Sequence, residues 1–145
     1  MKYQQLNNGW GAEPNAPDPQ IEIDFAQGKL KLKFYLNPFI YKDVEEEIRA
    51  ELEFSNCFMF RLGPTNDEGF YRGQCRFSKT GINWGEFYQL EETEWKETFP
   101  KDKVIVLNHL INEEGLRHYL FYFRDVTFEC IAKDYHYKNL NDYSK

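Results

Sequence analysis

The sequence predicts an all-β protein of about nine antiparallel strands, folded as a meander-rich β-sandwich or a flattened β-barrel with at most one short helix. Three observations predict this class. Apolar and polar residues alternate with a period of two along most of the chain, which is the side-chain period of a strand. The chain contains 13 Phe and 10 Tyr, residues that favour a pleated sheet. The connections between the alternating segments are short, so neighbouring strands are expected to run antiparallel.

Length and turn-forming residues divide the chain into one domain and two flanking segments. At 145 residues the chain has the size of a single domain. Residues 1–20 are expected to form an irregular N-terminal arm, because three Pro and two Gly fall within 7–19. Residues 21–137 form the antiparallel β-domain, and 138–145 form a polar tail. Trp10 is expected to dock on the domain, and the alternative is that the arm acts as a lid or binds a partner.

The domain is expected to be organised around a β-hairpin over residues 116–137, with its turn at Arg124-Asp125. In the first arm Tyr119, Phe121 and Phe123 share one face, and His118, Leu120, Tyr122 and Arg124 share the other. Both faces are largely apolar, which predicts a central strand that is covered on both sides. The second arm has one wetter face, which carries Thr127, Glu129 and Lys133.

Two charged rows predict which strands are neighbours in the first half of the domain. Residues 21–25 and 29–36 form a hairpin, with Gly28 in a left-handed position of the connection. Lys29, Lys31 and Lys33 alternate with apolar residues in its second strand, and Glu47, Glu51 and Glu53 alternate with apolar residues in a strand over 46–54. Opposite charges stabilise adjacent strands, so the two strands are expected to pair.

The remaining elements are weaker in pattern. Ser55-Asn56 predicts a tight turn, and Gly85 a bulge or a close approach of another backbone. A single helical turn is expected within 91–99, where Pro100 stops it. Further strands are expected over 57–62, 70–77, 84–91 and 104–111.

Charge and cysteine content restrict the partners and the compartment. With 18 basic and 24 acidic residues the net charge is −6, which argues against nucleic acid and against an anionic membrane as partners. The same charge is compatible with a basic protein partner. Cys57, Cys75 and Cys130 lie far apart among apolar residues, so they are expected to be buried free thiols. Without a signal-peptide pattern or a long apolar run, the expected location is cytoplasmic.

The sequence contains no motif of a catalytic, metal or cofactor site. There is no nucleophile elbow, no phosphate-binding glycine loop and no paired spacing among His109, His118 and His136. His118 and His136 are interpreted as ordinary strand or rim residues. A Cys–His pair or a carboxylate pair across a cleft stays open as an alternative, because spacing in the sequence does not give the distances. We therefore expect a non-enzymatic protein without a cofactor or a metal.

The most specific constellation combines arginine with aromatic residues. If strands 57–62, 70–77 and 84–91 are adjacent, their arginines and aromatic rings share a face, and such residues dominate interface hot spots. The alternative is that the arginines pair with the abundant glutamates on a solvated face. The candidate ligand- or partner-binding residues are Arg61, Arg72, Arg76, Tyr71, Trp84 and Tyr88, together with Asp67 and Glu68 in an acidic loop.

Three segments resemble those of small, uncharacterised bacterial β-rich proteins that have no known activity: NDEGFYRGQCRFSK, NWGEFY and HYLFYFRDVTFECIA. In size and acidity the chain is also similar to immunity proteins of bacterial toxin systems, a likeness of type alone. The favoured function is a soluble β-domain that binds a protein partner, in the manner of an immunity protein. The alternative is a β-barrel or sandwich that holds a small apolar or carboxylate ligand, with Arg61, Arg72 or Arg76 as its anchor. A homodimer through an exposed sheet edge is a further hypothesis.

Overall fold

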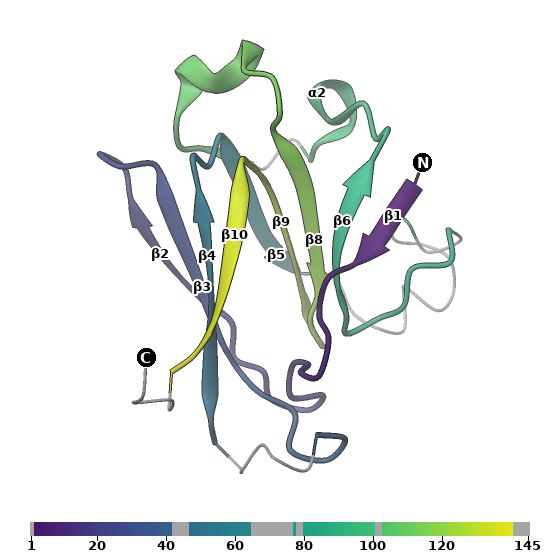
Figure 1. The fold of residues 1–145 in the computed structure, drawn as a ribbon. Coiled ribbons are helices and arrows are strands. Elements are labelled where there is room, and N and C mark those ends of the chain that lie inside the picture. Colours follow the sequence, from purple (N-terminus) through teal and green to yellow (C-terminus); the bar gives the residue numbers. More distant parts are fainter. Residues whose placement is uncertain (1, 42–46, 65–76, 78–79, 101–102, 141–145) are drawn as a thin grey trace.

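The protein is a β-sandwich of two antiparallel sheets, seen in a computed structural model that describes residues 2–41, 47–64, 77, 80–100 and 103–140 (Figure 1). The six-stranded sheet has the order β1-β6-β8-β9-β5-β7 and the four-stranded sheet the order β10-β4-β3-β2. The strands are β1 (Lys2–Gln5), β2 (Gln20–Asp24), β3 (Lys29–Tyr35), β4 (Arg49–Ser55), β5 (Met59–Pro64), β6 (Phe87–Glu91), β7 (Val104–Ile105), β8 (Arg117–Tyr122), β9 (Val126–Ala132) and β10 (Asp134–Asn139). The helices are α2 (Trp95–Thr98) and the 3₁₀ helix η1 (Asn108–Asn112). The predicted class is confirmed, and of its two forms the sandwich is observed.

The central hairpin consists of β8 and β9, paired from Arg117 opposite Ala132 to Tyr122 opposite Thr127. The backbone N–H of Phe123 donates to the Val126 carbonyl at 2.9 Å and closes the predicted turn. The prediction that the first arm is covered on both faces is confirmed, because every residue of β8 after Arg117 is buried. The predicted wetter face of the second arm is wrong. Each residue of β9 after Val126 is buried, since β9 lies between β8 and β5 and both of its faces are covered.

The chain crosses between the sheets at two points that the sequence pattern did not predict. The second arm of the hairpin was expected to continue to residue 137, but β9 ends at Ala132 and β10 pairs with β4 in the other sheet. Ser55-Asn56 likewise leads from one sheet to the other and does not close a hairpin. The two crossings are bonded together, because the Lys133 N–H donates to the Ser55 carbonyl at 3.0 Å.

The charged rows pair as expected. Lys31 lies opposite Glu53 and Lys33 opposite Glu51, so β3 and β4 are neighbours. Lys29 Nζ lies 3.6 Å from a Glu53 carboxylate oxygen, and Lys33 Nζ lies 2.9 Å from that of Glu22 in β2. Exposed pairs of this kind contribute about 0.2–1 kcal/mol each, so the rows set the register more than they stabilise the fold. Glu47 does not extend the glutamate row, because it precedes β4 with a φ of 63°.

The N-terminal arm is partly ordered as a strand. Residues 1–20 were expected to be irregular throughout, but Lys2–Gln5 form β1 and pair with β6. After β1 the arm carries Trp10 into the space between the sheets, where its side chain is only 7% exposed. Its ring stacks on Tyr137 of β10 at 4.3 Å between ring centroids and lies near Phe34 of β3. The predicted docking of Trp10 is confirmed.

Other local expectations have mixed outcomes. The helical turn before Pro100 is confirmed as α2. The predicted strand over 104–111 is wrong, because only Val104 and Ile105 pair with β5 and the chain then forms η1. Gly85 does adopt a left-handed φ of 86°, but the space where its side chain would point is open, so the turn and not a close approach requires it. Lys138 and Asn139, assigned to the polar tail, belong to β10. The predicted strand over 70–77 lies outside the described residues except for Phe77.

We expect Trp10→Ala to lower the free energy of unfolding by about 3–5 kcal/mol, because it opens a cavity among rings of both sheets. Trp10→Phe keeps part of the packing and is expected to cost less. Urea unfolding followed by circular dichroism measures both. A loss under about 1 kcal/mol for the alanine variant would show that the ring does not bridge the sheets.

We also expect stability to fall at alkaline pH. Burial raises the pKa of Tyr119 and of Tyr137 to about 12, above the ordinary tyrosine value near 10. As pH rises between these values the unfolded chain loses protons that the folded chain keeps, so the free energy of unfolding decreases by up to about 1.4 kcal/mol per pH unit for each group. Tyr119→Phe removes one titrating group and is expected to reduce this slope. Urea unfolding at a series of pH values tests it, and an unchanged slope contradicts it.

Candidate functional site

The structure describes three of the eight residues predicted to bind a ligand or partner. Arg61, Trp84 and Tyr88 are described, and Asp67, Glu68, Tyr71, Arg72 and Arg76 lie outside the described residues. Tyr88 of β6 lies opposite Leu120, Leu120 opposite Glu129, and Glu129 opposite Arg61. Directly opposed residues share a face, so Tyr88 and Arg61 lie on one face of the six-stranded sheet, three strand spacings or about 14 Å apart. This is the outer face, since the neighbouring Phe60, Phe87, Phe121 and Cys130 pack between the sheets.

The aromatic members of the predicted constellation belong to a second core on this outer face. Tyr88 is 2% exposed and packs with Ile82, Leu90 and Leu120. Its hydroxyl accepts a hydrogen bond from the Asn83 backbone N–H at 2.9 Å, and burial raises its pKa. The partly buried Trp84 stacks on Tyr122 at 4.7 Å. Tyr88 is therefore a packing residue, and it does not form a site with Arg61.

A buried polar relay lies beside Arg61 on the same face. Nε2 of His118 lies 3.3 Å from a carboxylate oxygen of Glu129, and its Nδ1 lies 2.9 Å from the Thr93 hydroxyl. The side chains of His118 and Glu129 are 1% and 2% exposed. Each ring nitrogen of His118 therefore has one polar partner within hydrogen-bonding distance. His118 is a residue of strand β8, one of the two alternatives that the sequence suggested, but it is buried and does not lie at a rim.

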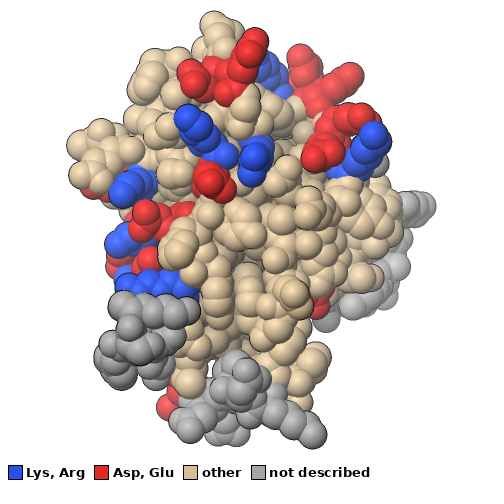
Figure 2. All heavy atoms as spheres, viewed as in Figure 1, with Lys and Arg blue, Asp and Glu red and all other residues tan. Residues whose placement is uncertain are grey.

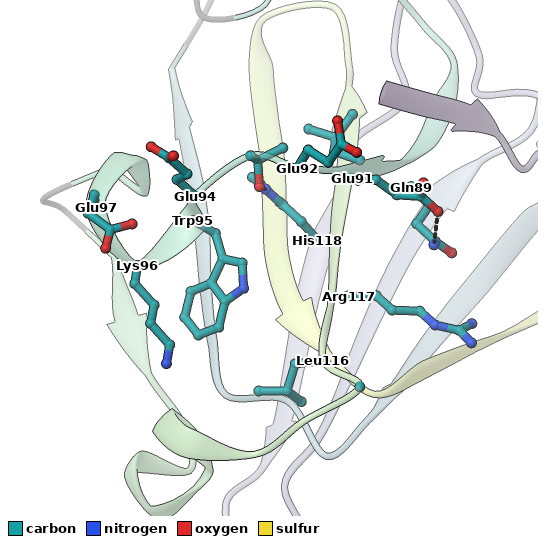
Figure 3. Close-up of a pocket in the computed structure, with 13 residues that line it drawn as sticks. Gln89, Glu91, Glu92, Glu94, Trp95, Lys96, Glu97, Leu116, Arg117 and His118 are labelled. Atoms are coloured by element: carbon teal, nitrogen blue, oxygen red, sulfur yellow. Dashed lines mark hydrogen bonds between the residues drawn. The ribbon is translucent and has the colours of Figure 1, made fainter. Parts of the chain in front are cut away.

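His118 and Thr93 line a pocket that has a volume of about 530 Å³. We call it the acidic pocket. Its walls are the end of β6, the turn into α2, the helix itself and the start of β8 (Figure 3). Trp95 projects from α2 toward the centre of the cavity, with Leu116 below it. The lining side chains with chemical function are Glu91, Glu92, Thr93, Glu94, Trp95, Lys96, Glu97, Arg117 and His118.

Carboxylates outnumber cations around this pocket by four to two. Glu92 is paired with Lys2 at 3.6 Å, and Lys96 lies over the ring of Trp95 at 5.6 Å. The exposed side chains of Glu94 and Glu97 make no ion pair with a described residue. Figure 2 shows Asp and Glu side chains, interspersed with Lys and Arg, over the upper end of the molecule, and mostly uncharged residues below them. The pocket therefore presents negative charge that its own cations do not balance.

Hydroxyl, imidazole and carboxylate stand in the order of a hydrolase triad. However, the surrounding glutamates oppose the negative charge that develops on an attacked carbonyl oxygen. Among the described residues no group of three or more His, Cys, Asp or Glu side chains is arranged to hold a metal ion. We therefore assign the relay a structural role, which is to fix the turn at Thr93 to β8 and β9.

Sequence reasoning missed the residues that shape this pocket. The segment from Glu91 to Glu97 was read only as a short helical turn, although its density of glutamates next to Trp95 was visible. The sequence did not indicate that Glu129 is buried, because the alternation along β9 placed it on the face expected to be exposed to solvent. Cys57 and Cys130 are buried free thiols, as predicted, while Cys75 lies outside the described residues.

Comparison with protein-family models, with curated proteins and with solved structures finds no significant match. Within the described part of the chain, the helices are all too short or too polar to cross a membrane. The function of the chain is therefore inferred from its own geometry.

We expect His118→Ala to lower the free energy of unfolding by about 1–3 kcal/mol, because it removes a buried hydrogen-bond partner of Glu129. A double-mutant cycle with Glu129→Gln is expected to give a coupling energy of about 0.5–3 kcal/mol. The exposed His136→Ala is the control, and its effect should stay within about 0.5 kcal/mol. Additive effects in the cycle would contradict the relay.

Proposed function

We propose that this chain is a non-enzymatic binding domain and that its acidic pocket receives a basic protein partner. The observation that carries the proposal is the pocket itself. Trp95 offers a large apolar surface, and Glu94 and Glu97 stand beside it without an ion pair to a described residue. Tryptophan is among the residues that are enriched at interface hot spots. A partner side chain of Lys or Arg would meet the glutamates while its aliphatic stem packs on the indole.

Two further features support a partner of this kind. The net charge of −6 adds a long-range attraction that speeds association with a basic surface. The pocket lies at one end of the sandwich, where the β6–α2 turn and the segment leading into β8 meet, so a large partner has access to it (Figure 1). A toxin-neutralising immunity protein is the kind of binding domain that this proposal favours.

The alternative function, a small apolar or carboxylate ligand held between the sheets, has less support. Aromatic rings occupy the interior, with Phe34, Phe121 and Phe123 in mutual contact at 4.2–5.5 Å between centroids. Arg61, the one described arginine among its proposed anchors, lies on the outer face opposite Glu129. Among the described residues, no Lys or Arg side chain lies in the interior to bind a carboxylate ligand.

The test begins with capture of the tagged protein from its own cells at low and high salt, followed by identification and purification of the retained partner. Binding of that partner is then compared for the wild type, Glu94→Gln/Glu97→Gln and the control Asp18→Asn/Asp125→Asn. The control removes the same charge from exposed positions near the other end of the sandwich. We expect the α2 variant to slow association several-fold at low salt, and the control to change it little.

Trp95→Ala is expected to raise the Kd by about tenfold or more, mainly through faster dissociation. Equal effects of the two charge variants would mean that only overall charge matters and would overturn the assignment of the pocket. Retention of nothing but the protein itself would remove the support for a protein partner.

A further inference from the structure

A second pocket lies at the opposite end of the β6–β8 pair and has a different composition. We call it the aromatic pocket, and its volume is about 300 Å³, at the small end of the range for ligand sites. It forms where the N-terminal arm, the segment after β3, the loop before β6 and the β8–β9 turn meet. Its lining includes Tyr41, Trp84, Glu86, Tyr122 and Arg124.

Four aromatic residues line this pocket, namely Tyr41, Trp84, Tyr122 and Phe123. Trp84 and the buried Tyr122 stack at 4.7 Å with an angle of 22° between their planes. The ring of Tyr41 packs against the backbone of Gly11, where an added Cβ would lie 3.1 Å from it. The absence of a side chain at Gly11 thus lets the arm approach Tyr41 closely. The faces of such rings carry partial negative charge, which attracts cations.

The carboxylate of Glu86 lies in the same pocket and is held by neutral donors. Its Oε2 accepts hydrogen bonds from the side-chain amides of Gln5, at 3.0 Å, and of Asn7. Asn7 is itself buried and fixed, because it donates to the Trp10 carbonyl and accepts from the Phe87 N–H. Amide donors orient the carboxylate without neutralising it. Burial raises the pKa of Tyr41, and the charge of Glu86 raises it further.

Among the described residues, the one cation that lines the pocket is engaged elsewhere. Nη1 of Arg124 donates to the Asn15 side chain at 3.1 Å, and its Nε lies 3.8 Å from the Asp125 carboxylate. Glu13, which also lines the pocket, accepts from the backbone N–H groups of Asn15 and Ala16. The described groups at this site therefore leave an excess of negative charge beside the aromatic rings.

We propose that the aromatic pocket binds an organic cation of the alkylammonium class, preferably a methylated one. Rings and a carboxylate together recognise a bulky, weakly hydrated cation, as in aromatic cages for quaternary ammonium groups. A guanidinium group is the poorer fit, because it prefers both oxygens of a carboxylate and the described contacts already occupy Oε2. The inference is independent of the acidic pocket and of the partner proposed for it.

The same headgroup occurs on free quaternary amines and on methylated lysine side chains. The test titrates choline and a peptide with trimethyllysine into the protein, by calorimetry and by NMR of the indole N–H signals. The neutral isostere 3,3-dimethylbutan-1-ol and methylguanidinium are the matched comparisons. We expect either ammonium probe to bind about tenfold tighter than the isostere and to shift the Trp84 signal, and the tighter of the two identifies the source.

Three variants test the residues. Trp84→Leu is expected to weaken binding by about 2- to 30-fold, and Glu86→Gln by about tenfold. Glu86→Gln keeps an oxygen that can accept from Gln5 and Asn7, and thermal unfolding checks that each variant folds. The control Trp95→Leu, in the acidic pocket, should leave binding unchanged. Equal binding of the isostere, tighter binding of methylguanidinium, no saturable binding, or no effect of Trp84→Leu would each overturn the proposal.

Discussion

The burial of the β8–β9 hairpin on both faces is the constraint on which the rest of the molecule depends. On the inner face its rings pack against β3, β4 and Trp10. Its outer face is buried as well. Among the described residues, loops and not a third sheet cover that face. Loops bring polar groups with them, and these need partners when they are buried. The relay of Thr93, His118 and Glu129 meets that need, and it fixes the turn that carries the acidic pocket.

The two pockets lie at opposite ends of the same strand pair, and each reflects the loops that meet there. The end of β6 leads into a glutamate-rich turn with one tryptophan, whereas its start follows Trp84 and Glu86. Both pockets combine rings with carboxylates, so both are suited to positive charge. They differ in scale, because the larger one is open at an end of the sandwich and the smaller one is shaped by the close contact of Gly11 with Tyr41.

The sequence predicted what depends on neighbours along the chain and on adjacent strands. Alternation placed β2, β3 and β4 correctly, and the lysine and glutamate rows identified the β3–β4 pair. It did not reveal where a strand leaves its sheet, although the apolar phase changes at the crossing: Phe128, Cys130 and Ala132 are followed by Lys133-Asp134 and then by Tyr135 and Tyr137. For the site, Trp84 and Tyr88 were found, but in separate roles. Glu129 was misplaced because a buried carboxylate is predictable only once its partner His118 is known to lie beside it.

The order of the strands has a consequence for folding during synthesis. The six-stranded sheet takes β1 and then β5 to β9, while the four-stranded sheet takes β2 to β4 and finally β10. Neither sheet is complete until most of the chain has been synthesised, because β1 pairs with β6 and β4 pairs with β10. Pairings this distant in sequence close long loops and are slow to form. While the chain emerges, the early β2–β4 meander therefore has to persist with its apolar face uncovered, the state in which β-proteins are most exposed to aggregation.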